Sequence, residues 1–227
     1  NSVRLATLAT ATTLCAGFLI TFCQRHLGSS ASMLLLRVSA LGYALPGTVL
    51  AVGLLGPMAW FDETIASALD YIGPIAVPAL SGSAAALILA YSLRFLAIPV
   101  NTLESAYRSI PSTVDDAARG LGAPDRVLAG RIHLPLLSPA AAASALMVLI
   151  ECMKELPATL LLRPLNVETL ATSIYGEASR GTYEEGAVAA LAIVVVGLIP
   201  VVILVRGFKL KARGRLQRRW CQHSAEA

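Results

Sequence analysis

Charged residues are scarce in this chain. Asp, Glu, Lys and Arg make up 14% of its 227 residues, and aromatic residues make up 6%. A soluble domain normally carries about 25% charged residues. Hydrophobic residues reach 56% and the mean hydropathy is +0.69. This composition excludes an ordinary soluble domain and indicates an integral membrane protein.

Cysteine and histidine are also few, with four and three residues. The sequence has no Cys-x-x-Cys pair and no Cys/His spacing typical of a metal cluster, so disulfides are not expected and metal ligands stay unassigned. No Ser/His/Asp set is recognisable, which argues against an enzyme. The phosphate-binding pattern G-x-x-x-x-G-K-[ST] is missing too. We therefore expect no cofactor on this chain, and ATP hydrolysis would have to occur on a partner.

Five long apolar stretches are present. Crossing a bilayer takes about 20 mostly apolar residues in a helix, and the candidates are 5–23, 40–60, 82–100, 136–156 and 186–205. We expect a single all-α transmembrane domain over 1–227. The first stretch is the most polar because of its threonines, whose hydroxyls neighbouring helices could satisfy. The chain begins with Asn1, and we expect a fragment or a processed product.

Basic residues predict the orientation in the membrane. With the loop 104–135 in the cytoplasm, fourteen of the eighteen Lys and Arg lie inside or at the inner rim, including Arg94, and four lie outside, including Lys154. This split follows the positive-inside rule and places the N-terminus outside and the C-terminus in the cytoplasm. Acidic residues such as Glu155 gather on the outer side. The basic tail 209–219 follows an apolar stretch directly, which favours anionic membrane lipid over nucleic acid as its partner.

A polar island separates the third and fourth apolar stretches. It reads Asp116-Ala117-Ala118-Arg119-Gly120-Leu121-Gly122, then nine residues, then Ile132-His133-Leu134-Pro135. Ser112 can cap a short helix here, with Asp115 reaching back to it. Gly122 can end that helix and Pro124 can open the next one. Leu134-Pro135 is expected to end the second helix. The pattern predicts helix, sharp turn, helix.

This spacing resembles the EAA loop of ABC-importer permeases: Glu-Ala-Ala, three residues, Gly, nine residues, Ile, one residue, Leu-Pro. Only the first position departs, with Asp116 in place of Glu. In that family the loop is cytoplasmic, and its first short helix docks in a cleft on the ATP-binding subunit. The resemblance implies an ATPase-coupling loop whose residues are Asp116, Ala117, Ala118, Gly122, Ile132, Leu134 and Pro135.

Further segments resemble the ferric-iron permeases of bacterial binding-protein-dependent ABC importers. They are 43–50, 109–111, 154–164 and 168–172, and the similarity covers most of the chain, which matches the C-terminal half of a two-half permease. The resemblance implies a type I permease core of about five helices in the bacterial inner membrane. It also implies three kinds of partner: a cytoplasmic ATPase dimer that binds ATP and Mg, a periplasmic binding protein that delivers ferric iron, and a second permease half or copy.

Other functions remain open on the same residues. Thiamine and other small-solute permeases share the loop, so another solute is the alternative cargo. A channel, or a membrane scaffold whose loop recruits a partner, is the alternative class. Dependence on an ATPase partner would separate a transporter from a channel.

Three charged residues close the fourth apolar stretch. Glu151, Lys154 and Glu155 share one helix face by their spacing. Charges at this depth are costly and usually face the bundle interior or a water-filled cavity. They either line the outer mouth of a translocation path or form an interfacial ion pair. Nearby, 62–69 is expected to be a separate amphipathic helix along the outer face, and 158–162 a re-entrant piece.

Overall fold

The computed structural model describes residues 1–28, 30–70, 80–199 and 201–202. Regular structure within these ranges is entirely helical, which confirms the all-α prediction. The elements are α1 (Ser2–Leu27), α2 (Ser30–Ala44), α3 (Gly47–Asp70), α4 (Ala84–Phe95), α5 (Ala97–Arg108), α6 (Ser112–Gly120), α7 (Asp125–Val127), the π-helix η1 (Leu128–His133), α8 (Leu134–Lys154), α9 (Pro157–Leu162) and α10 (Leu170–Arg180). Residues 183–199 form a further helix.

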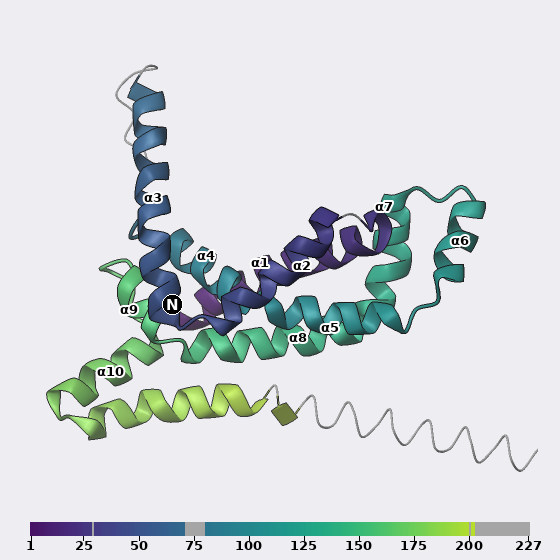
Figure 1. Cartoon of the computed structure of the whole chain (residues 1–227). Coiled ribbons are helices and arrows are strands. Elements are labelled where there is room, and N and C mark those ends of the chain that lie inside the picture. The colour runs from purple at the N-terminus through teal and green to yellow at the C-terminus, as the bar shows by residue number, and fades with distance from the viewer. Residues whose placement is uncertain (29, 71–79, 200, 203–227) are drawn as a thin grey trace, which may run out of the picture.

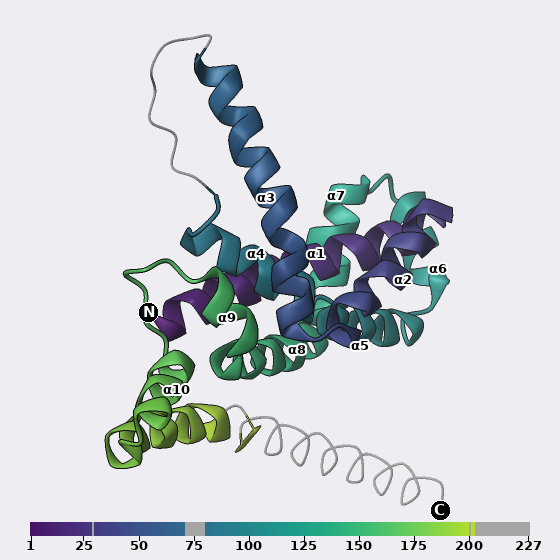
Figure 2. The ribbon, with the colours of Figure 1, turned by 60° about the vertical axis from the view of Figure 1, so that its left-hand side comes forward.

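Helix α1 is the centre of the bundle. It packs against α2, α4, α5 and α8, and α5 lies along α8 (Figure 1). Helix α3 rises away from this layer in both views and contacts α4 and α9 (Figures 1 and 2). Helix α6 lies at one end of the bundle, and α9 and α10 lie at the opposite end (Figure 1). The predicted loop helix and the segment after α8 therefore occupy opposite ends of the molecule.

Small apolar residues let these helices approach closely. Ala9, Ala90 and Val148 are fully buried where α1, α4 and α8 meet. A second buried cluster, built on Leu103 and Leu137, joins α5 to α8. Helices in a membrane gain little from the hydrophobic effect, so close van der Waals packing holds them together.

The threonines of α1 are satisfied mainly within their own helix. Thr10 donates to the carbonyl oxygen of Ala6 at 2.6 Å, and Thr21 donates to that of Gly17 at 2.9 Å. Contact with another helix is made by Thr12, whose hydroxyl lies 2.6 Å from that of Ser92. The hydroxyls therefore mostly bond one turn back in the same helix, contrary to the expectation that neighbouring helices satisfy them.

Three helices are long and apolar enough to cross a membrane, namely Ser2–Leu27, Gly47–Ala68 and Asp125–Lys154. Helices α4 and α5 pass the same test together despite a 44° bend between them, so the described residues hold up to four crossings. Of the five predicted stretches, 186–205 is helical over 186–199 and runs past the described residues.

The predicted stretch 40–60 is divided in the structure. Helix α2 ends at Ala44 and α3 begins at Gly47, so a single helix over 40–60 is wrong. The reason is Pro46, which has no N–H to donate and disfavours helix at the residue before it. The apolar helix that precedes the break already begins at Ser30.

The segment after the break also differs from the prediction. Residues 62–69 do not form a separate helix, because α3 runs on to Asp70. The Asp62 carboxylate accepts hydrogen bonds from the backbone N–H groups of Leu80, at 2.6 Å, and Ser81, at 2.8 Å. These bonds join α3 to the chain that enters α4.

Helix α9 corresponds to the predicted short piece 158–162. It contacts α3 and α4, and Ala158, Thr159 and Leu162 are buried. The Tyr91 hydroxyl of α4 is hydrogen-bonded to the Thr159 hydroxyl. The segment is therefore part of the packed core at the end of the bundle away from α6.

Replacing Gly42 by alanine tests the contact between α2 and α4. A Cβ at Gly42 would lie 2.1 Å from the carbonyl oxygen of Leu93, so the two helices would have to separate. We expect Gly42→Ala to cost about 1–3 kcal/mol, as overpacking does, and to lower the Tm of the purified protein in detergent. Gly53→Ala is the matched control, because its Cβ meets nothing within 4 Å. Equal Tm values for the two variants would contradict the close contact.

Candidate functional site

The first loop helix, α6, begins differently from the prediction. Its N-cap is Pro111, whose extended backbone precedes the helix, and Ser112 is already the first helical residue. No side chain caps this end, so the predicted Ser112 cap is wrong. The Asp115 carboxylate that was expected to reach back is bonded elsewhere, to Arg25 and His133.

The end of α6 is a tight glycine turn. Gly122 has φ +78°, a left-handed conformation that favours glycine. Its N–H donates to the Arg119 carbonyl at 2.9 Å, and the N–H of Ala123 donates to the Ala118 carbonyl at 3.0 Å. This pair of bonds is a Schellman motif, which satisfies two carbonyls at the helix end. Gly122 therefore ends the helix as its position in the sequence predicts.

The second loop helix does not stop at Pro135. Helices α7, η1 and α8 join into one helix over Asp125–Lys154, of 30 residues, so the predicted end at Leu134-Pro135 is wrong. The turn before Pro135, Leu128–His133, is a π-helix. Such a widened turn accommodates a residue that cannot donate an N–H and whose ring would crowd the carbonyl of the preceding turn. The second loop helix and the membrane span that follows it are therefore one continuous helix.

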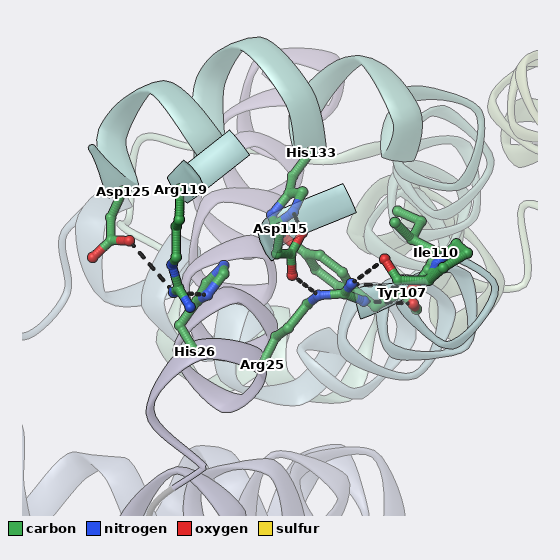
Figure 3. Close-up of polar contacts among 9 residues, drawn as sticks. Arg25, His26, Tyr107, Ile110, Asp115, Arg119, Asp125 and His133 are labelled. Atoms are coloured by element: carbon green, nitrogen blue, oxygen red, sulfur yellow. Dashed lines mark hydrogen bonds and ion pairs between the residues drawn. The ribbon is translucent and has the colours of Figure 1, made fainter. Parts of the chain in front are cut away.

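Arg25 fastens α6 to the bundle. Its Nε lies 2.6 Å from Oδ2 of Asp115, and its Nη1 donates to the Tyr107 carbonyl at 2.8 Å (Figure 3). Its Nη2 donates to the Ile110 carbonyl at 3.0 Å. One guanidinium near the end of α1 therefore holds both the end of α5 and the first turns of α6.

His133 completes the contact from the other side. It is fully buried, its Nε2 lies 2.8 Å from Oδ1 of Asp115, and its Nδ1 lies 3.3 Å from the Tyr107 hydroxyl. A neutral ring with its proton on Nε2 satisfies both contacts. Burial by itself would raise the pKa of Asp115, but the bonds from Arg25 and His133 outweigh it and hold that pKa below its ordinary value. Asp115 is therefore an ionised bridge between α1 and η1.

A second polar contact lies beside the first. Nη2 of Arg119, on the last turn of α6, lies 2.9 Å from Nδ1 of His26 and 3.6 Å from Oδ1 of Asp125 (Figure 3). The His26 ring stacks on the His133 ring, with centroids 5.4 Å apart. Both ends of α6 are thus connected to α1.

The predicted loop residues divide by exposure. Asp116, Ala117, Gly122, Leu134 and Pro135 are exposed and Ile132 is half-buried. Ala118 is only 7% exposed, so its side chain offers less surface to a partner than that of Ala117. The reason is the helical spacing, because Ala118 shares the inward face of α6 with Asp115.

Several residues that shape the candidate site escaped the sequence analysis. The bundle anchor of the loop is made by Arg25, Tyr107 and His133, and Leu121 is 89% exposed at the tip of the loop. Arg25 lies 90 positions before Asp115, so no local spacing could have indicated their contact. Leu121 could have been found, since an apolar residue beside a turn glycine has nothing local to cover it.

The three charged residues at the end of α8 do not act as one group. Lys154 pairs with Glu151 at 2.7 Å, and its side chain is 54% exposed, as expected of an interfacial ion pair. Glu155 lies beyond the last residue of α8, with extended backbone, and is buried. Its Oε2 lies 3.1 Å from Nε of Arg94. The shared helix face predicted for all three is therefore wrong for Glu155.

The Arg94–Glu155 pair also corrects the predicted depth of Arg94. The pair joins the end of α8 remote from α6, so Arg94 cannot lie at the rim next to α6. Nη1 of Arg94 donates to the carbonyl of Leu45, in the break between α2 and α3, at 3.0 Å. A Cβ at Gly47 would lie 2.5 Å from Oε1 of Glu155, so glycine leaves the room that the pair needs.

Comparison with known proteins identifies this fold. The chain matches the family model "binding-protein-dependent transport system inner membrane component" over residues 13–213. It is 29% identical over 118 residues to the Fe(3+)-transport system permease protein FbpB 2 of Haemophilus influenzae. That match covers 52% of this chain and 23% of the relative, so the chain spans less than a quarter of the relative's length there.

Solved structures show the same architecture. A bacterial alginate ABC transporter, in complex with an alginate-bound periplasmic protein, has a TM-score of 0.68 at 17% identity, covering 90% of this chain and 74% of that one. The inward-facing MetNI methionine ABC transporter has a TM-score of 0.67 at 14% identity, covering 92% of each chain.

These matches identify the all-α membrane domain, with its helix-turn-helix loop at one end, as the core of an importer-type permease. The chain belongs to the binding-protein-dependent transport system inner membrane components. It is a multi-pass membrane protein with the fold of a type I ABC-importer permease. Proteins of this family are transport subunits and not themselves enzymes.

Asp115 and Asp116 are neighbours with opposite structural roles, which gives a matched test. Removing one partner of a buried ion pair costs about 3–5 kcal/mol, and we expect Asp115→Asn to reach the lower part of that range because Arg25 is partly exposed. Asp116 is exposed, so Asp116→Asn should change the free energy of unfolding by less than about 0.5 kcal/mol. Thermal unfolding in detergent measures both. Similar losses in both variants would show that Asp115 does not anchor α6.

Proposed function

We propose that this chain is the membrane-spanning permease, or one half of it, of an ATP-driven importer that carries ferric iron. ATP and Mg bind to a separate cytoplasmic ATPase dimer. The observation that carries the proposal is α6, a short helix at the end of the bundle that is tied to α1 by Arg25 and Asp115. A helix held in this way can pass a displacement to the spans.

The exposed side of α6 is the surface proposed to meet the ATPase. Asp116 and Ala117 lie on it, and Leu121 follows at the tip with 89% of its surface exposed. A small side chain lets a partner approach closely, while an exposed leucine supplies an apolar anchor that only a partner can bury. Proposed coupling residues at Gly122, Ile132, Leu134 and Pro135 shape the turn and the start of the span behind this surface.

Movement of α6 would reach the spans by two routes. One is the Arg25–Asp115 pair, which leads into α1. The other is the continuous helix Asp125–Lys154, which carries His133 near its start and ends beside Glu155. Closure of the ATPase dimer would favour one of two arrangements of the bundle by its differential affinity for them. Alternating access is the proposed mechanism.

The translocation path is proposed to pass the Arg94–Glu155 pair. Charges inside a membrane domain are expensive and usually line a path or cavity. This pair sits where three helix interruptions meet: the break after α2, the bend between α4 and α5, and the break after α8. Glu151 and Lys154 would lie at the outer rim of the same path.

Ferric iron is the proposed cargo because the relative from Haemophilus influenzae is an Fe(3+)-transport permease. A periplasmic binding protein would deliver it, free or chelated, to the end of the bundle that carries α9 and α10. The N-terminus would then lie outside and the C-terminus in the cytoplasm, beside anionic lipid. A second permease half or copy would complete the path.

Partner binding tests the docking surface. We expect the chain, with its upstream sequence restored, to co-purify with its cognate ATPase, and the double variant Asp116→Arg/Leu121→Ser to lose that partner because both the charge and the apolar anchor are changed. Leu165→Ser is the control for the loss of an exposed leucine, since Leu165 is fully exposed but lies between α9 and α10 at the opposite end. Retention of the ATPase by the double variant would refute this surface, and a chain that never binds an ATPase would favour a channel or scaffold.

Radioactive uptake tests the cargo. Cells that contain the restored permease, its ATPase and its binding protein should accumulate 55Fe(III), and Ala117→Trp should reduce uptake to near background because the bulky ring blocks docking. Permease abundance in the membrane should stay the same, since Ala117 is exposed. ATP-dependent uptake of thiamine without uptake of iron would keep the importer and overturn the cargo.

A further inference from the structure

Two imidazoles and one carboxylate converge where α6 meets the bundle. His26 comes from α1, Asp115 from α6 and His133 from the end of η1 (Figure 3). One ligand atom from each residue can be chosen so that all three lie within 4.8 Å of one another. The sequence did not indicate this group, because its members are spread over more than 100 positions.

The residues behind these three side chains form an outer shell. Arg25 holds Oδ2 of Asp115, the Tyr107 hydroxyl lies against Nδ1 of His133, and Arg119 lies against Nδ1 of His26. Oδ1 of Asp115 and Nε2 of His133 face the inner side, where they are hydrogen-bonded to each other. Metal binding would move the His133 proton from Nε2 to Nδ1, where the Tyr107 hydroxyl can accept it. Metal-binding His and Asp side chains are oriented by outer hydrogen bonds such as those of Tyr107 and Arg25. Arg119 differs, because it donates to Nδ1 of His26 and would have to release that nitrogen before Nε2 could bind a metal.

One inner atom lacks a partner. Nε2 of His26 is buried and has no hydrogen-bond partner among the described residues. Leaving a buried polar atom unpaired costs about 1–3 kcal/mol, so such an atom calls for an explanation. A ligand between His26 and the Asp115–His133 pair would satisfy it.

The local charge permits a cation. The pocket here is lined by three arginines and by two acids of α6, Asp115 and Asp116. Arg108 pairs with Glu104 and Arg119 lies 3.6 Å from Asp125, so nearby acids offset the positive charge. Arg119 is half exposed and already lies 3.6 Å from Asp125, so it can release His26 and keep an acidic partner. His26 can then carry its proton on Nδ1 and offer Nε2 as a ligand.

We propose that His26, Asp115 and His133 bind a divalent transition-metal ion, of the class of Zn²⁺ or Fe²⁺. Two imidazoles with one carboxylate suit these ions. At metal–ligand distances of about 2.0–2.2 Å, two ligand atoms can be no more than about 4.4 Å apart, so the ligand separations, all within 4.8 Å, need at most a slight contraction. His26, near the end of α1 and only partly buried, supplies that movement.

The bound ion would join α1, α6 and the 125–154 helix at one point. A consequence for transport rests on the proposed function. If α6 couples an ATPase to the spans, an ion from the cytoplasm would restrict the movement of α6 against α1 and the 125–154 helix and would slow transport. Binding itself does not depend on that function, because it can be measured without the ATPase or the cargo.

Titration of the purified full chain with Co²⁺ tests the site. Bound Co²⁺ gives visible absorption, and Zn²⁺ should displace it. We expect one tight equivalent per chain, weakened at least about tenfold in His26→Ala, since even loss of an outer-shell partner costs about 10–100-fold. Arg119→Gln should tighten binding, because it frees Nδ1 of His26. A purely structural role for His26 would not produce that gain.

Two control variants exclude other ligands. Glu168→Gln, an exposed acid between α9 and α10 at the opposite end of the bundle, should bind Co²⁺ as the parent does. The double variant Cys221→Ser/His223→Ala should also bind normally, which excludes the tail. Unchanged binding in His26→Ala, loss of binding in the tail variant, or no tight equivalent in the parent would overturn the proposal. Failure of the ATPase test with intact Co²⁺ binding would remove the regulatory consequence and leave the site.

Discussion

The ion pair between Arg25 and Asp115 is the contact on which the loop depends. A nine-residue helix outside the bundle has little to hold it, because short helices are marginal on their own. Arg25 supplies the missing restraint by binding the Asp115 carboxylate, the Tyr107 carbonyl at the end of α5 and the Ile110 carbonyl between α5 and α6. His133 shares the same carboxylate, so α1, α5, α6 and η1 meet at one buried anion. The orientation of α6 relative to the spans follows from this geometry.

At the other end of the bundle a second ion pair has a similar role. Arg94 and Glu155 meet beside interruptions of three helices, where backbone groups lack their usual partners. Arg94 satisfies the Leu45 carbonyl, and Oε1 of Glu155 accepts the N–H of Ala158 at the start of α9. Gly47 leaves room for the pair, because a Cβ there would lie 2.5 Å from Oε1 of Glu155 and displace it. The long helix 125–154 therefore connects two ion pairs, one at each end of the bundle. This arrangement suits a molecule in which a displacement at one end is passed to the other.

The metal site proposed at the loop depends on the same anchor. Asp115 already joins two elements by hydrogen bonds, and the histidines beside it are held by Tyr107 and Arg119. An ion there would replace hydrogen bonds with stronger and more directional ones. The same residues would thus hold α6 by hydrogen bonds at all times and hold it more tightly when the metal ion is bound.

The sequence by itself determined the membrane class, the all-α fold and the turn at Gly122. These depend on composition, on apolar runs and on one glycine with a left-handed backbone, which are local properties. Only the tertiary structure decided that Ala118 faces inward, that helix continues through Pro135, and that Glu155 pairs with Arg94 and not with Lys154. It also decided that His26, Asp115 and His133 meet. The Arg94–Glu155 pair and the cluster of His26, Asp115 and His133 depend on which helices lie side by side, and contacts between residues 60 or 90 positions apart leave no mark in local spacing.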